Sequence, residues 1–441
     1  MQKTPNQFVK PVTWKRNEKG NIEIGGCDLE QLIDEYGSPL YVYDEATIRA
    51  VTKSFKEAFK DTDIHMMFAA KAFMTQAICK IMQQEGFGLD CVSEGEIYTA
   101  KTAGFDMQNV VFNGNNKSYE EIVFAIDSKV GLFSVDNFTE AKMLNSISAA
   151  KDKITNILLR ITPGIECHTH EYIQTGQIDS KFGFDLTQID EIISLIKNEY
   201  KNLNLIGLHA HLGSQIFQKD LYADAVEIMM REAKRIKDAY DINLTTFNIG
   251  GGAGIKYVEE DEPLSLFEIA DTVKESLKIN SKKYGMSNPH LYIEPGRCIV
   301  CTAGVTVYTT GSSKNVPNGK KYVAVDGGMA DNIRPALYDA KYTVETVQNK
   351  DGEPLEEVTV AGRFCESGDI LAKNVKLPKL YEGDLICFYD TGAYCYSMSS
   401  NYNRVLKPAA VIVKDGKSAI IINRQTLDNI IENDCIPEIL G

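Results

Sequence analysis

The sequence predicts an α/β protein in which a (β/α)8 barrel is joined to a β-rich domain with a sandwich-like or barrel-like fold. Eight short apolar runs between Thr62 and Arg297 alternate with stretches of helical spacing. Beyond Arg297 the chain becomes rich in β-branched and aromatic residues. Eight strand–helix units within roughly 250 residues are typical of the barrel, and a doubly wound open sheet is the structural alternative.

Each predicted barrel strand is followed by polar or glycine residues and then by a helix. Two helices begin with capping boxes, Ser93 with Glu96 and Ser118 with Glu121. Amphipathic periodicity predicts longer helices over Leu186–Glu199, Asp220–Ala239 and Ser265–Lys283. The predicted strands are Ile64–Ala69, Gly88–Val92, Val110–Phe112, Gly131–Val135, Ile157–Ile161, Leu205–His209, Thr246–Ile249 and Leu291–Ile293.

We expect an N-terminal segment over residues 1–44, the barrel over 45–297 and the β-rich domain over 298–441. The N-terminal pieces Asn21–Ile24 and Leu40–Tyr43 resemble strands and are expected to join the β-rich domain. Asp415-Gly416 is a hairpin turn signal within the last predicted strand region. The strand regions of this domain are Ile299–Thr310, Lys321–Val325, Glu357–Val360, Leu385–Tyr389 and Ala409–Arg424.

Composition excludes several classes of protein. The formal net charge of −14 over 441 residues argues against nucleic-acid partners, which require a basic surface. No apolar run approaches the roughly 18 residues of a membrane span, and Met1–Lys10 lacks a signal-peptide core. Ten scattered cysteines without regular spacing indicate reduced thiols and a cytoplasmic location. The spacing of Cys167, His168 and His170 fits no standard zinc pattern, so no metal is expected.

Candidate functional residues lie where the predicted strands end, because barrel active sites form at the C-terminal ends of strands. The loops after strands seven and eight build the phosphate site of many barrels, and here they are Gly250–Gly254 and Glu294–Arg297. Glycine backbone can approach a phosphate closely, and an arginine adds positive charge. The strand ends carry Lys71, Ser93, Asn113, Asp136, Arg160, His211 with Ser214, the glycine segment, and Glu294 with Arg297.

Three of these residues suggest the chemistry of an organic cofactor. A lone lysine such as Lys71 usually extends from a helix start into solvent, but opposite a phosphate pocket its amine can form a Schiff base with a carbonyl cofactor. His211 is placed to stack on a planar ring, although a histidine there is often only a hydrogen-bonded core residue. Glu294, aimed at a pyridine nitrogen, would keep it protonated and make the ring an electron sink suited to decarboxylation.

The ordered set of motifs resembles the fold-type III pyridoxal-phosphate-dependent decarboxylases, and it extends through nearly the whole chain. Each motif alone is weak, whereas the set in this order is specific. The motifs are Phe68–Ala72, Asp90–Glu96, His168–Gly176 with Ser180–Gly183, Gly207–Gln215, Asn248–Gly252, Glu294–Arg297, Asp326–Gly328, Arg334–Tyr338, Cys365–Asp369 and Gly392–Tyr394.

The resemblance implies a role for each matching position. Lys71 would bind pyridoxal phosphate covalently, His211 would stack on its ring and Glu294 would hold the ring nitrogen. The phosphate would lie among Ser214, Gly251, Gly252, Arg297 and Tyr394, with Arg297 and Tyr394 also meeting substrate. Cys365, as proton donor, and Glu366, as a ligand for the distal ammonium, would reach into the partner's site, which implies a head-to-tail homodimer with shared active sites. The chain departs from the family at Arg363, where proline is usual.

The substrate can be argued from the paired charges. Arg334, with Tyr338, offers a bidentate fork for a second carboxylate, and Glu366 would bind an ammonium group. Together they describe a distal amino-acid group and predict decarboxylation of meso-2,6-diaminopimelate to L-lysine. The alternatives are decarboxylation of another basic amino acid or of carboxynorspermidine, an amino-acid racemase of the same fold, which Glu294 opposes, and a non-catalytic cofactor carrier, which the presence of Lys71 and Cys365 opposes.

Overall fold

The computed structural model describes residues 3–164, 181–317 and 319–440. The chain divides into two compact units. The first, called here the barrel unit, comprises residues 1–7, 51–256 and 262–299. The second, the β unit, comprises residues 8–50, 257–261 and 300–441. Each unit is therefore assembled from segments that are far apart in the sequence.

The barrel unit contains a closed ring of eight parallel strands, as predicted. The strands follow the order β9-β11-β12-β13-β5-β6-β7-β8, and β8 pairs again with β9, so that Phe133 lies opposite Ile157. This last pairing closes the sheet and excludes a doubly wound open sheet. A short strand, β10 (Phe184–Asp185), pairs with β9 outside the ring. The bounds are β5 Ile64–Ala69, β6 Gly88–Cys91, β7 Val110–Phe112, β8 Leu132–Val135, β9 Thr155–Thr162, β11 Leu203–His209, β12 Thr246–Asn248 and β13 His290–Ile293.

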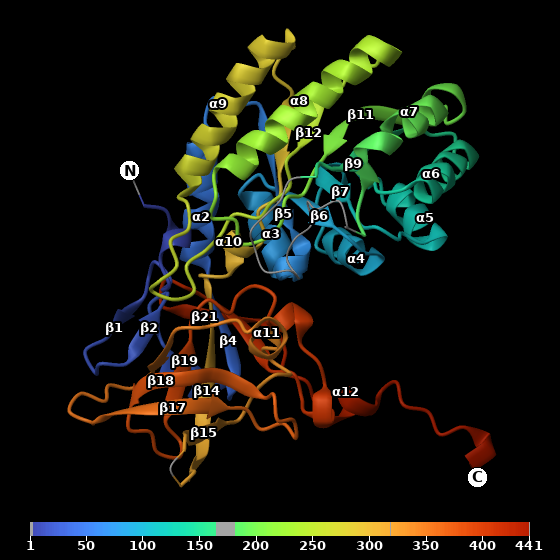
Figure 1. The fold of residues 1–441 in the computed structure, drawn as a ribbon. Helices are drawn as coiled ribbons and strands as arrows, with labels where there is room; N and C mark the ends of the chain where they lie inside the picture. The colour runs from blue at the N-terminus through green and yellow to red at the C-terminus, as the bar shows by residue number, and fades with distance from the viewer. Residues whose placement is uncertain (1–2, 165–180, 318, 441) are drawn as a thin grey trace. The chain divides into compact units, whose positions relative to one another are not determined.

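Helices cover the outside of the ring, and α8 and α9 run side by side (Figure 1). Ser118 and Glu121 form the predicted capping box of α5. Ser93 caps α4, but Glu96 accepts a hydrogen bond from the Val92 N–H instead, so that box is incomplete. None of the described helices combines the length and the apolar composition needed to cross a membrane. The helices are α2 Glu45–Ala58, α3 Gln76–Gln84, α4 Glu94–Thr102, α5 Tyr119–Asp127, α6 Phe138–Ala150, α7 Ile189–Asn198, α8 Asp220–Tyr240, α9 Leu266–Tyr284 and α10 Arg297–Val300.

Apolar side chains fill the inside of the barrel. Met67, Val111, Leu132 and Leu158 form a buried cluster, and Ile206 and Tyr292 pack against it. These residues come from six different strands of the ring, so they meet in its interior. The polar residues of the same strands lie nearer their C-terminal ends, where the candidate site is located.

The β unit is built around a nine-stranded sheet that includes an N-terminal strand, as predicted. Strand β4 lies between β14 and β20, antiparallel to the former and parallel to the latter. The sheet order is β18-β17-β15-β14-β4-β20-β21, with β19 pairing with β14 and β16, and β1, β2 and β3 form a small separate sheet. The strands are β1 Lys15–Arg16, β2 Ile22–Ile24, β3 Cys27–Asp28, β4 Leu40–Asp44, β14 Gly304–Asn315, β15 Lys321–Val325, β16 Val344–Thr346, β17 Leu355–Ala361, β18 Ile370–Pro378, β19 Leu385–Phe388, β20 Ala409–Lys414 and β21 Lys417–Ile422.

Two details of the β unit differ from the sequence prediction. The predicted strand Ile299–Thr310 begins only at Gly304, because Ile299 and Val300 are buried within the short helix α10. A short buried apolar run does not distinguish a strand from a helical turn. Strands β1, β3, β16 and β18 were not predicted. The turn at Asp415-Gly416 is confirmed, since both residues have positive φ, as a type I′ hairpin requires. The remaining helices of this unit are α1 Leu29–Tyr36, α11 Arg334–Tyr338 and α12 Leu427–Ile431.

Gly207 on β11 offers a test of the strand packing. A Cβ atom placed on Gly207 would lie 1.7 Å from the Thr246 carbonyl oxygen of the adjacent strand β12. We expect Gly207→Ala to lower the free energy of unfolding by about 1–3 kcal/mol, because the strands must separate locally to make room. Denaturant unfolding would measure the change. Gly95→Ala is the control, since the added Cβ would meet only Ser93 Oγ, at 3.8 Å, and alanine favours the helix; equal losses in both variants would contradict the packing argument.

Candidate active site

A pocket of about 310 Å³ opens at the C-terminal ends of the barrel strands. Lys71 lies at its rim, in a single 3-10 turn, Ala70–Ala72, that directly follows β5. The side chain of Lys71 is exposed. The other polar residues that line the pocket include Asp90, Asn113, Arg160, His209, His211 and Glu294. Six strands therefore contribute residues to one pocket, as predicted from the polar residues at the strand ends.

The carboxylate of Glu294 is buried and lies beside nitrogen atoms of Asn248, Asn113 and His209. Asn248 Nδ2 donates to Glu294 Oε1 at 2.6 Å, and Asn113 Nδ2 donates to the same oxygen at 3.1 Å. His209 Nε2 lies 3.5 Å from Glu294 Oε2. Burial opposes ionisation, but His209 and the hydrogen bond from Asn248 outweigh it and lower the pKa of Glu294. Glu294 is therefore an anion at neutral pH.

A second carboxyl group, Asp90, lies beside Glu294 and has the opposite protonation state. Asn113 Nδ2 donates to Asp90 Oδ1 as well as to Glu294. Burial raises the pKa of Asp90 well above its usual value, and the negative charge of Glu294 raises it further. Two buried carboxylates that share one hydrogen-bond donor would repel each other, so Asp90 retains its proton while Glu294 is ionised.

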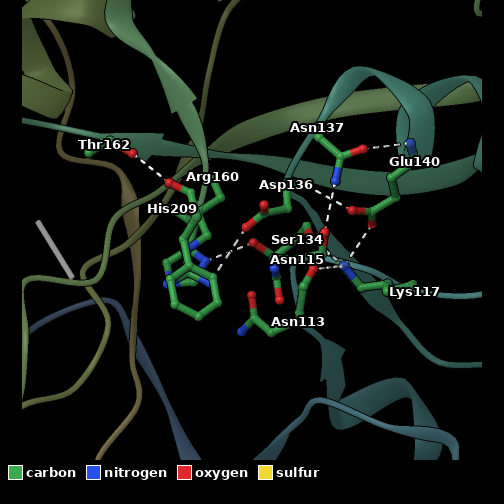
Figure 2. A network of polar contacts seen from close by, with 12 residues as sticks. Asn113, Asn115, Lys117, Ser134, Asp136, Asn137, Glu140, Arg160, Thr162 and His209 are labelled. Carbon is green, nitrogen blue, oxygen red and sulfur yellow. Dashed lines mark hydrogen bonds and ion pairs between the residues drawn. The ribbon is translucent and has the colours of Figure 1, made fainter. Parts of the chain in front are cut away.

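Ser134 orients the ring of His209. Ser134 Oγ lies 2.7 Å from His209 Nδ1, and both residues are buried. Figure 2 shows this contact within a larger network that also contains an ion pair of Lys117 with Glu140, 2.7 Å long and buried. The backbone N–H of Asp136 donates to the same glutamate, and Asp136 Oδ1 lies 3.6 Å from Arg160 Nη1. The network fixes the loop after β7 and the arginine that line one wall of the pocket.

His211 contacts the glycine segment Gly250–Gly254. The N–H of Gly251 donates to His211 Nδ1 at 3.2 Å. Burial, followed by the positive charges of Lys71 and Arg160, lowers the pKa of His211 well below its usual value, so the ring is neutral. A Cβ atom on Gly251 would lie 2.1 Å from the Glu294 carbonyl oxygen. Only glycine permits this approach, which brings Glu294 and the glycine loop together.

Hydrogen bonds join the loops after β11, β12 and β13. Arg297 Nη2 donates to Ser214 Oγ at 3.0 Å. The N–H of Ile216 donates to the Gly252 carbonyl oxygen at 2.9 Å. Buried Asn6 also holds the glycine loop, because its Nδ2 donates to the Gly254 carbonyl oxygen at 2.9 Å. Glycine backbone, a hydroxyl and a guanidinium in one place fit an anionic group such as a phosphate.

In the β unit, Arg334 is a buried cation surrounded by neutral groups. It is only 6% exposed, and its Nη1 donates to Tyr257 Oη at 2.8 Å and to Tyr342 Oη at 2.9 Å. The ring of Tyr338 lies 5.9 Å from its guanidinium carbon. No carboxylate among the described residues forms an ion pair with Arg334. An uncompensated buried charge is costly, so a negatively charged ligand is the expected partner.

Cys365 and Glu366 are exposed on a loop of the β unit. The buried carboxylate of Asp369 holds this loop, because it accepts hydrogen bonds from the N–H groups of Phe364 (2.8 Å) and Met329 (2.6 Å). Tyr394 is half-buried and has a φ of 60°, a left-handed conformation.

The unusual residue Arg363 takes part in the same loop. Its N–H donates to the Gly327 carbonyl oxygen at 2.9 Å, a bond that a proline at this position could not make. The loop is therefore fixed here by a main-chain contact to the Asp326–Gly328 motif.

The structure brings part of the predicted site together within one unit. Lys71, His211, Ser214, Gly251, Gly252, Glu294 and Arg297 all belong to the barrel unit, whereas Arg334, Tyr338, Cys365, Glu366 and Tyr394 belong to the β unit. The motif His168–Gly176, with Cys167 and His170, lies outside the described residues. Sequence reasoning missed Asp90, Ser134 and Asn248 as site residues. Asp90 and Asn248 begin two of the sequence motifs, but no role was assigned to them, and the only signal of Ser134 was a polar residue within an apolar strand.

Residues 45–301 match the family described as "Pyridoxal-dependent decarboxylase, pyridoxal binding domain". The match covers more than half of the chain, and it contains every residue of the pocket described above. The chain therefore belongs to the pyridoxal-dependent decarboxylase family, and pyridoxal phosphate is its cofactor.

Individual relatives agree with this assignment. The chain is 45% identical to diaminopimelate decarboxylase of Bacillus subtilis, with 96% of this chain and 97% of the relative covered. It is 41% identical to diaminopimelate decarboxylase of Staphylococcus aureus, with 96% and 100% covered. Among solved structures, diaminopimelate decarboxylase of M. jannaschii in complex with L-lysine has a TM-score of 0.92 and 31% identity, with 99% of this chain and 100% of that chain covered.

The opposite protonation states of Asp90 and Glu294 generate a prediction for Asp90→Asn. Because the folded-state pKa of Asp90 is raised, the wild type must take up a proton on folding above pH 4, and it loses stability as the pH rises toward that pKa. The variant has no such proton, so its stability relative to wild type should increase from pH 5 to pH 8, by up to about 1.4 kcal/mol per pH unit. Denaturant unfolding at several pH values would measure this slope.

Asp152→Asn is the matched control for Asp90→Asn. Asp152 is exposed and has a φ of 51°, which asparagine also adopts readily. Its stability difference from wild type should not change with pH. A flat difference for Asp90→Asn as well would show that Asp90 is ionised in the folded protein.

Proposed function

We propose that this chain is a diaminopimelate decarboxylase, which converts meso-2,6-diaminopimelate to L-lysine and CO2. Relatives of that name at up to 45% identity support the proposal over the full length of the chain. The observation that carries the reaction type is the buried, ionised Glu294 within the family's cofactor domain. The observation that carries the substrate is Arg334, a buried cation without a carboxylate partner among the described residues.

The barrel residues hold pyridoxal phosphate in this proposal. The Lys71 amine binds it, Ser214, Gly251, Gly252 and Arg297 hold its phosphate together with Tyr394, and His211 presents its neutral ring face. Glu294, kept ionised by Asn248 and His209, holds a proton on the pyridine nitrogen. Bound pyridoxal phosphate supplies a conjugated ring that accepts the electron pair left behind when CO2 departs. A protonated ring nitrogen favours this outcome over racemisation.

The residues of the β unit recognise and protonate the substrate in this proposal. Arg334 and Tyr338 bind the distal carboxylate, Glu366 binds the distal ammonium, and Arg297 and Tyr394 meet the reacting end. The Cys365 thiol then donates its proton to the carbon that has lost CO2. Since Cys365 and Glu366 are exposed, we propose that they act in the site of a partner subunit, so that two chains form a homodimer with shared active sites.

We also propose a cytoplasmic location. Nine cysteines lie in the described ranges, seven of them buried, and they form no disulfide with one another. Reduced thiols in this number fit a reducing compartment.

The substrate assignment predicts a pattern of CO2 release. We expect release from meso-diaminopimelate, and little from its LL isomer, lysine, ornithine or arginine. Lysine, ornithine and arginine lack a distal carboxylate for Arg334, and the LL isomer differs from the meso compound at one of its two amino-acid centres. Lys71→Ala should abolish release and the visible absorption of bound cofactor together. CO2 release from ornithine or arginine at a comparable rate would contradict the substrate assignment. Loss of optical rotation without CO2 release would indicate a racemase.

Shared active sites predict complementation between inactive chains. Lys71→Ala and Cys365→Ala should each be inactive alone. When the two are mixed, unfolded and refolded together, about one quarter of the wild-type activity should return, because half of the dimers are mixed and each has one intact site. Each variant refolded by itself is the control. If the mixture stays inactive while capture through a tag carried by only one variant recovers both chains, each chain supplies both residues to its own site.

A further inference from the structure

The guanidinium of Arg334 makes its hydrogen bonds with described residues through one nitrogen only. Nη1 donates to both Tyr257 and Tyr342. Nε is buried and has no hydrogen-bond partner among the described residues. An edge formed by Nε and Nη2 can bind a carboxylate with two parallel hydrogen bonds, and no described residue takes that place here.

The two tyrosines are themselves fixed. They are 7% and 4% exposed, and their rings meet edge to face with centroids 5.4 Å apart. Tyr342 Oη donates to Asn332 Oδ1 at 3.4 Å, and this oxygen also accepts a hydrogen bond from the Arg334 backbone N–H at 3.3 Å. Tyr257 Oη lies 3.2 Å from Cys301 Sγ. The surrounding protein therefore fixes the two hydroxyls. Because they cannot move with the guanidinium, they orient it.

We propose that Tyr257 and Tyr342 are positioning residues that hold Nη1 of Arg334 and thereby aim its Nε–Nη2 edge at a distal carboxylate of the ligand. The two hydroxyls set the preference for ligands that carry this group. Two tyrosines that only satisfied a buried cation could bond to different nitrogens, whereas both here bond to Nη1 and leave the bidentate edge intact. The inference rests on the proposed role of Arg334 in binding substrate.

A pair of ligands that differ by one carboxylate tests the inference. L-lysine carries the distal carboxylate, and 1,5-diaminopentane is the same chain with both amines and no carboxylate. Calorimetric titration of the cofactor-loaded enzyme should show that Tyr257→Phe and Tyr342→Phe each weaken lysine binding about tenfold, the loss expected for a charge-assisted hydrogen bond. Diaminopentane binding should change less than about twofold. In turnover, KM for meso-diaminopimelate should rise while kcat is kept.

Tyr308→Phe is the matched control. Tyr308 is a fully buried tyrosine of β14 whose hydroxyl has no hydrogen-bond partner among the described residues. Losing this hydroxyl should leave the affinities for both ligands unchanged. A double-variant cycle gives a second readout, because Tyr342→Phe should have no further effect on lysine binding in an Arg334→Met background.

Three outcomes would overturn the inference. Equal losses for lysine and diaminopentane would mean that the tyrosines support the fold in general. Unchanged lysine binding in both variants would mean that Arg334 needs no positioning. If the wild type itself does not distinguish the two ligands, the distal-carboxylate role of Arg334 fails, and this failure of the proposed function is recognisable before any variant is made.

Discussion

The negative charge on Glu294 is the constraint on which the barrel site depends. An isolated carboxylate inside a protein would take up a proton, so the charge survives only because other strands supply donors to it. Asn113 follows β7, Asn248 ends β12 and His209 ends β11, and closure of the ring brings them to the same carboxylate. Asp90 on β6, which cannot ionise beside it, remains neutral. The protonation pattern is thus a property of the closed barrel and not of any single segment.

The position of Glu294 also determines the geometry of the glycine loop. Gly251 packs against the Glu294 carbonyl oxygen and donates its N–H to His211. The N–H of Glu294 in turn donates to the Gly250 carbonyl oxygen at 2.8 Å. The groups assigned to the cofactor's phosphate, ring face and ring nitrogen are therefore linked through backbone contacts, and none can shift without moving the others.

Sequence reasoning predicted the elements whose signals are local. The eight strands, the position of Lys71 after β5, and Glu294 after β13 follow from apolar runs and from the residues that end them. Asn248 and Ser134 were not predicted, because their roles require the register between strands far apart in the sequence. The helical turn at Ile299 was read as strand, since burial makes both apolar. Arg334 was recognised, but Tyr257 lies 77 residues away and has no local signal that connects the two.

The buried charges of Glu294 and Arg334 are compensated in different ways. Glu294 is surrounded by donors that satisfy it within the protein, so its charge is stable before any ligand arrives. Among the described residues, the Arg334 side chain donates only to the phenols of Tyr257 and Tyr342, and both bonds use Nη1. A ligand carboxylate that reaches the Nε–Nη2 edge completes a charge pair that the fold leaves incomplete, whereas a ligand with only an amine there would add a second positive charge in a poorly hydrated place. Discrimination by Arg334 therefore comes as much from rejecting the wrong ligand as from binding the right one.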